Sequence, residues 1–140
     1  MYMPTFVPPI ALRQRRALAG LTKILVVDDN VAVRGVLTSM LNTLELQVLT
    51  AEDGLLGLQM AEAERPHLII TDIDMPNLDG IQMIARLRQH SELREVPILV
   101  ISGEGERKAS EALEAGANHV MPKPVMLNSF IGLITQLISG

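Results

Sequence analysis

The sequence predicts an α/β domain built on a parallel β-sheet, and three observations support this class. Apolar runs of strand length recur five times after Lys23, and several are apolar throughout, as expected of strands that helices cover on both faces. Longer segments with apolar residues at helical spacing lie between these runs. The chain has 140 residues, which suffices for one domain with a substantial core and is too short for two.

The N-terminal residues differ in composition from the rest of the chain. Residues 1–21 contain three prolines and three arginines but no acidic residue. Pro9 and Gly20 bracket residues 10–19, which predicts one short helix between them. We therefore divide the chain into an N-terminal extension at 1–21 and one domain at 22–140. A frayed extension, a packed extra helix and an arm that docks on a partner remain open alternatives for the first segment.

Each apolar run is expected to form one strand, because it is rich in β-branched residues or leucine and is too short for a helix. The fifth run ends just before Pro122, which has no N–H group to offer a neighbouring strand, so this strand is expected at an edge of the sheet. The five expected strands are 24–27, 46–49, 68–70, 98–101 and 118–121.

The segments between and after the strands are expected to form five helices whose apolar stripes cover the sheet. Right-handed crossovers between parallel strands would place these helices on both faces. Asp79 is placed to cap the third helix, and Glu52 and Asp53 are interpreted as charges at the start of the second. The stripes include Val33, Val36 and Leu37, then Leu55 and Leu58, then Ile81 and Ile84, then Ala112 and Leu113, and finally Phe130 and Ile134.

Composition and charge exclude several functions. The chain has no cysteine, which excludes disulfides, thiol catalysis and cysteine-bound metals. Three of its 12 basic residues but none of its 16 acidic residues lie in the extension, so residues 22–140 carry a net charge of −7. An acidic body argues against DNA as the main partner. No apolar run reaches the roughly 20 residues that span a bilayer, and no signal peptide is present, so we expect no membrane insertion and a cytoplasmic location.

Polar side chains with complementary chemistry follow four of the five expected strands. In an open parallel sheet, ligands bind beyond the carboxyl ends of the strands, so these side chains are expected to converge at one edge. They are Asp28 and Asp29 after the first strand, Asp72 and Asp74 after the third, Ser102 after the fourth and Lys123 after the fifth.

This combination of residues suits phosphoryl transfer to an aspartate. Clustered carboxylates raise one another's pKa unless a cation lies among them, and oxygen ligands that leave room for water suit Mg²⁺. An aspartate is already ionised at neutral pH and can attack phosphorus without a general base. Mg²⁺, a lysine and a hydroxyl would neutralise the charge on the phosphoryl oxygens. The residues themselves therefore indicate an aspartate that accepts a phosphoryl group.

Four runs of the sequence resemble the receiver domain of two-component response regulators. They are ILVVDDN at 24–30, LIITDIDMPNLDG at 68–80, ILVISG at 98–103 and AGANHVMPKP at 115–124. The runs occur in the order and at the spacing of receivers, and the similarity covers about residues 22–139. The resemblance implies a flavodoxin-like (βα)5 fold, in which a doubly wound parallel sheet has the strand order 2-1-3-4-5.

The resemblance also implies a role for each acidic residue. Asp72 would be the phosphoacceptor, and Asp29 and Asp72 would ligate Mg²⁺ directly. Asp28 would act mostly through water, and Asp74 would contribute its backbone carbonyl. Taken alone, Asp28 and Asp29 would be interpreted as an N-cap pair at the start of the first helix, but beside Asp72 and Lys123 the metal-ligand interpretation is favoured.

Two further residues would contact the phosphoryl group: the hydroxyl of Ser102 through a hydrogen bond and Lys123 through a salt bridge. The resemblance also implies a cis peptide bond between Lys123 and Pro124. The chain departs from most receivers at Val120, where they carry a tyrosine or phenylalanine that reorients on activation. We therefore expect a reduced or differently built switch, with smaller amide chemical-shift changes on activation than in receivers that have the ring.

The leading functional hypothesis is a stand-alone receiver, a single-domain response regulator and not a metabolic enzyme. Its implied partners are a sensor histidine kinase or a histidine phosphotransfer protein, which supplies the phosphoryl group, and a downstream protein that the sequence does not identify. One alternative is a receiver-fold interaction module that works without phosphate. Another is a haloacid-dehalogenase-type phosphatase, which shares the DxD pattern of Asp72 and Asp74 but normally has it after the first strand.

Overall fold

Strands and helices alternate along the whole domain. The computed structural model describes residues 22–103 and 105–139, except for the side chain of Glu106, so the helix expected at 10–19 lies outside the described residues. The elements are β1 (Lys23–Val27), α2 (Val31–Leu41), β2 (Gln47–Ala51), α3 (Gly54–Glu64), β3 (Leu68–Thr71), α4 (Gly80–Gln89), β4 (Ile98–Ser102), α5 (Glu106–Ala115), β5 (His119–Pro122) and α6 (Leu127–Ser139).

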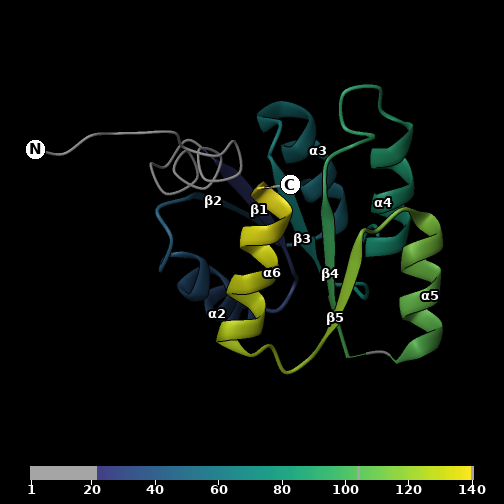
Figure 1. Cartoon of the computed structure of the whole chain (residues 1–140). Coiled ribbons are helices and arrows are strands. Elements are labelled where there is room, and N and C mark those ends of the chain that lie inside the picture. The colour runs from purple at the N-terminus through teal and green to yellow at the C-terminus, as the bar shows by residue number, and fades with distance from the viewer. Residues whose placement is uncertain (1–21, 104, 140) are drawn as a thin grey trace, which may run out of the picture.

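The five strands form one parallel sheet in the order β2-β1-β3-β4-β5, which confirms the predicted architecture. Each strand begins and ends within two residues of its expected range. β5 lies at an edge of the sheet, as its terminal Pro122 predicts. Because all the strands are parallel, their carboxyl ends lie on the same side of the molecule (Figure 1).

Helices cover both faces of the sheet and bury two separate cores (Figure 1). α3, α4 and α5 pack on one face, and α2 and α6 pack on the other. Because successive side chains of a strand point to opposite faces, Leu25 and Val27 of β1 belong to the first core, and Ile24 and Val26 to the second. A strand such as β1 is therefore almost entirely apolar, because helices bury both of its faces.

Three residues named in the expected helical stripes are exposed, so the prediction that they lie in the core was wrong. Leu55, at the start of α3, is 43% exposed. Val36 is 52% exposed and lines a groove of about 490 Å³ beside α2. Leu113 is 49% exposed and lines a groove of about 510 Å³ between α5 and β5. Helical spacing identifies the side of a helix that points to the sheet, but it does not tell how far the neighbouring element covers the margin of that side.

Capping side chains fix where three of the helices begin. Asp53 accepts a hydrogen bond from the Leu56 amide at the start of α3, and Asp79 forms a capping box with Gln82 at the start of α4, as predicted. The N-cap of α2 is Asn30, so the N-cap alternative for the two aspartates before it is wrong. None of the described helices combines the length and the apolar character needed to span a membrane.

Candidate functional site

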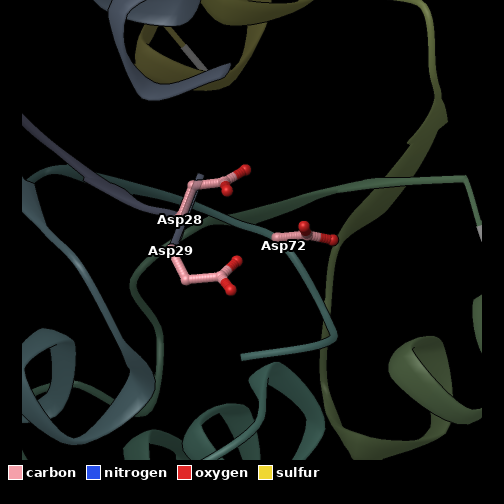
Figure 2. Close-up of side chains that lie close together, drawn as sticks. All are labelled: Asp28, Asp29 and Asp72. Atoms are coloured by element: carbon pink, nitrogen blue, oxygen red, sulfur yellow. The ribbon is translucent and has the colours of Figure 1, made fainter. Parts of the chain in front are cut away.

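The carboxyl ends of β1 and β3 bring three carboxylates together. Asp28 and Asp29 follow β1, and Asp72 follows β3, which is the direct neighbour of β1 in the sheet. One carboxylate oxygen from each lies within 4.8 Å of the others, and Figure 2 shows the three side chains gathered at one place. The predicted convergence of these three residues therefore occurs in the structure.

Asp28 is the most buried member of this cluster, with only 1% of its surface exposed. Its Oδ1 accepts a hydrogen bond from the amide of Asn30 at 2.9 Å, whereas its Oδ2 is buried and has no hydrogen-bond partner among the described residues. Burial raises the pKa of Asp28 above its ordinary 3.8, the Asn30 amide opposes this rise, and the nearby Asp72 adds to it. An unpartnered buried carboxylate oxygen beside two more carboxylates is chemically suited to a hard divalent cation or its water.

Asp72 has one fixed oxygen and one oxygen paired with a cation. Its Oδ1 accepts a hydrogen bond from the Ile73 amide at 2.7 Å, and its Oδ2 lies 3.1 Å from the Nζ of Lys123. The side chain of Asp72 is only 12% exposed, and that of Lys123 is 31% exposed. The peptide bond between Lys123 and Pro124 is cis, as expected.

Ser102 and Asp74 complete the set of residues singled out from the sequence. Ser102 is buried at the end of β4, and its carbonyl accepts a hydrogen bond from the amide of Lys123 at 3.1 Å. Asp74 is exposed in the segment between β3 and α4, two residues beyond Asp72. The roles of Ser102, Lys123 and the Asp74 carbonyl toward a ligand remain predictions.

Two glycines allow the segment after Asp72 to pack tightly. A Cβ atom at Gly80 would lie 2.1 Å from the carbonyl oxygen of Asp72, and one at Gly54 would lie 1.9 Å from that of Leu78. Both helix starts therefore press directly on the backbone that follows the phosphoacceptor candidate. Any larger side chain at these positions would displace that backbone.

Sequence reasoning missed two contacts that hold the site in place. The guanidinium of Arg34, on α2, donates a hydrogen bond to the backbone carbonyl of Asp28 at 2.7 Å. The side chain of Asn77 donates to Asp53 at 2.9 Å and so joins the segment after β3 to the start of α3. Together with the Leu56 amide, Asn77 holds the pKa of Asp53 below its ordinary 3.8. No pattern in the sequence predicts hydrogen bonds of this kind between distant residues.

Val120 lies in β5 beside the site, where it is half-buried and packs against the first core. It lines the groove of about 510 Å³ between α5 and β5, which also reaches Ser102. The departure from the usual aromatic residue thus lies in β5, in a groove that Ser102 also lines.

Comparison with known proteins places these features in a family. The model of the response regulator receiver domain matches residues 24–135. The two-component response regulator ORR3 of Oryza sativa subsp. indica is 31% identical over 117 residues, which cover 82% of this chain and 89% of ORR3. A probable chemotaxis protein CheY of Rhizobium etli is 32% identical over 126 residues, which cover 89% of this chain and 98% of that protein.

A solved structure agrees with the same assignment. The receiver domain of a sensor histidine kinase from Pseudomonas aeruginosa PAO1 is 29% identical and aligns with a TM-score of 0.81, covering 87% of this chain and 100% of that one. In that receiver a magnesium ion is coordinated in the active site cleft. Fold, strand order, acidic cluster and family model agree, and the chain belongs to the response regulator receiver domains.

Proposed function

We propose that this receiver accepts a phosphoryl group on Asp72 from a phosphohistidine donor in a Mg²⁺-dependent reaction. The observation that supports it most strongly is the position of Asp72, which pairs with Lys123 and has a carboxylate oxygen within 4.8 Å of one from Asp28, the residue whose buried Oδ2 has no partner among the described residues. A carboxylate flanked by a cation site and an ammonium group is an ionised nucleophile beside two sources of positive charge.

The residues divide the work of the transfer. Asp28, Asp29 and Asp72 would hold Mg²⁺, with a further contribution from the backbone carbonyl of Asp74. When bound, Mg²⁺ supplies positive charge that stabilises the phosphoryl oxygens during transfer. A carboxylate oxygen of Asp72 forms the bond to phosphorus while the P–N bond of the donor breaks, and the electron pair of that bond stays on the donor's imidazole.

The remaining two side chains stabilise the product. Lys123 lies 3.1 Å from Asp72, within reach of an oxygen of a phosphoryl group attached there. The Ser102 hydroxyl, at the end of the neighbouring β4, would donate a hydrogen bond to another phosphoryl oxygen. Lys123 already pairs with Asp72 before transfer and would shift to a phosphoryl oxygen, whereas the bond from Ser102 to the phosphoryl group would form only in the phosphorylated state and so favour it.

The partners follow from this chemistry. The donor would be a sensor histidine kinase or a histidine phosphotransfer protein, and the phosphorylated receiver would bind a downstream protein or pass the group on. The protein would catalyse only its own phosphorylation and dephosphorylation. We further propose that the protein is cytoplasmic and acts without DNA contacts, and that residues 22–140 form the receiver and residues 1–21 an extension.

The proposal is tested by incubation with Mg²⁺ and acetyl phosphate followed by rapid intact-mass measurement. Mass is the suitable readout because the chain has no tryptophan for a fluorescence assay. We expect one added phosphoryl group in the wild type and none in Asp72→Asn or in a sample without Mg²⁺. An adduct that survives in Asp72→Asn would contradict the proposal, because the acceptor would then be another residue.

One observation favours a second candidate, a receiver-fold module that binds its partner without phosphate. Val120 stands where the resemblance to receivers implies a ring that couples phosphorylation to the face formed by α5, β5 and α6. The absence of both a phosphoryl adduct and beryllofluoride binding would support this module. The phosphatase alternative has no comparable support, because the DxD run follows β3, and the family model that matches is that of receivers.

A further inference from the structure

Arg34 reaches the acidic cluster from α2 but contacts backbone, not carboxylate. Its Nη1 donates a hydrogen bond to the carbonyl oxygen of Asp28 at 2.7 Å. This carbonyl belongs to the peptide group that links Asp28 to Asp29. The orientation of that one peptide plane sets the directions in which the two adjacent side chains leave the backbone.

Other hydrogen bonds fix the surroundings of this peptide group. The amide of Asp28 donates to the carbonyl of Ala51 at 3.1 Å and so continues the pairing of β1 with β2. The carboxylate of Asp28 accepts from the amide of Asn30 at 2.9 Å. Arg34 adds the bond to the carbonyl oxygen between these two points. Amide, carbonyl and side chain of Asp28 are thus each held by a different neighbour.

Arg34 is itself held in place. Its amide donates to the carbonyl of Asn30 at 2.9 Å, and its own carbonyl accepts from the hydroxyl of Thr38 at 2.8 Å. The side chain is half-buried and lines a shallow depression of about 250 Å³ together with Thr50 of β2. The guanidinium thus contacts the backbone after β1 from a side chain that lies beside Thr50 of β2.

We propose that Arg34 is a positioning residue for the cation site, which it serves by orienting the peptide between Asp28 and Asp29. The inference rests on the proposed Mg²⁺-dependent function. Side chains that hold the ligands of a metal, without touching the metal, typically change its affinity by about 10- to 100-fold when they are removed.

The direction in which removal of the Arg34 side chain changes the Mg²⁺ affinity distinguishes a positioning role from a simple charge effect. Removal of a positive charge near three carboxylates would strengthen the binding of a cation if Arg34 acted only through its charge. A positioning role predicts the opposite, because the two aspartates would no longer be held toward the same point. A role in stability alone would lower the melting temperature and leave the Mg²⁺ affinity of the folded protein unchanged.

The test measures the Mg²⁺ dissociation constant of the full chain from amide chemical shifts, without phosphodonor. We expect Arg34→Met to weaken Mg²⁺ binding about tenfold. Arg34→Lys should restore most of the affinity, because its ammonium can still donate to the carbonyl. Arg94→Met is the matched control: it removes the same charge from an exposed residue in the loop before β4, at the opposite edge of the sheet, and should leave the affinity unchanged.

Two results would overturn the inference in distinguishable ways. If the wild type binds Mg²⁺ and Arg34→Met binds it equally well or more tightly, Arg34 is not a positioning residue, while the proposed function stands. If the wild type shows no Mg²⁺-dependent shifts near Asp28 and Asp72, the proposed function fails and this inference fails with it. Arg34→Gln, which is too short to reach the carbonyl, gives the same comparison if the methionine variant does not fold.

Discussion

Asp28 keeps a carboxylate almost completely buried beside two other acidic side chains. Burial is the main reason that its pKa is raised, and the charge of Asp72 adds to the rise. A carboxyl group whose pKa is higher in the folded state than in the unfolded state lowers stability at every pH above that raised pKa. Asp28, which offers an unpartnered oxygen to a cation, therefore lowers the free energy of unfolding of the cation-free protein.

We predict that Asp28→Asn stabilises the cation-free protein by about 1–2 kcal/mol at neutral pH. The amide keeps an acceptor for the Asn30 N–H and replaces the unpartnered oxygen with a donor facing carboxylates. Urea unfolding followed by circular dichroism would measure the difference. Because the penalty disappears once Asp28 is protonated, the advantage of the variant should shrink as the pH falls toward 3.8. A gain that persists undiminished at acidic pH would contradict this explanation.

Arg88 joins four segments near the amino-terminal ends of β4 and β5, on the side of the sheet opposite the acidic cluster. Its guanidinium leaves α4 and donates to the carbonyl of Gly116 at the end of α5 and to the side chain of Asn118 before β5. It also donates to three carbonyls in the loop before β4, those of Leu93, Arg94 and Val96. Burial lowers the pKa of Arg88, but a guanidinium stays charged at neutral pH, so it needs these acceptors.

We predict that Arg88→Met destabilises the protein by about 2 kcal/mol, because several carbonyls lose a charged donor together. The side chain of Arg86, two residues earlier on the exposed face of the same helix, provides the control. Arg86→Met removes the same charge and should change the free energy of unfolding by less than about 0.5 kcal/mol. Equal losses in the two variants would mean that net charge, and not the carbonyl contacts, determines the effect.

For the whole molecule, the alternation of apolar runs and amphipathic segments sufficed to predict the parallel sheet and its five strands. The strand order and the roles of Asp28, Asp29 and Asp72 came from the resemblance to receivers, since periodicity alone does not order the strands. The convergence of the carboxylates followed from a general property of parallel sheets and is found in the structure.

What the sequence did not predict depends on contacts between distant residues. Asn30, and not an aspartate before it, caps α2, because the carboxylate of Asp28 turns back to accept the Asn30 amide. The contact of Arg34 with a carbonyl and the many acceptors of Arg88 have no local signature, because a backbone acceptor can belong to any residue type. The exposure of Val36 likewise depends on where the neighbouring segment leaves a groove.

Binding at the acidic cluster should stabilise the whole fold, because a cation that binds only the folded state raises its stability by mass action. At a Mg²⁺ concentration ten times the dissociation constant, this gain is about 1.4 kcal/mol, which corresponds to a rise in Tm of about 4 °C for a domain of this size. Thermal unfolding followed by circular dichroism, with and without Mg²⁺ at constant ionic strength, would measure it.

The Mg²⁺-dependent rise in Tm should depend on pH and on the presence of Asp28. Protons compete with the cation for the carboxylates, and the raised pKa of Asp28 makes this competition begin at a higher pH than for an ordinary aspartate. The Mg²⁺-dependent rise in Tm should therefore decline as the pH falls through that raised pKa, and it should be small at every pH in Asp28→Asn. If the variant kept the full rise in Tm, the cation would be bound elsewhere, and the buried carboxylate would have no part in holding it.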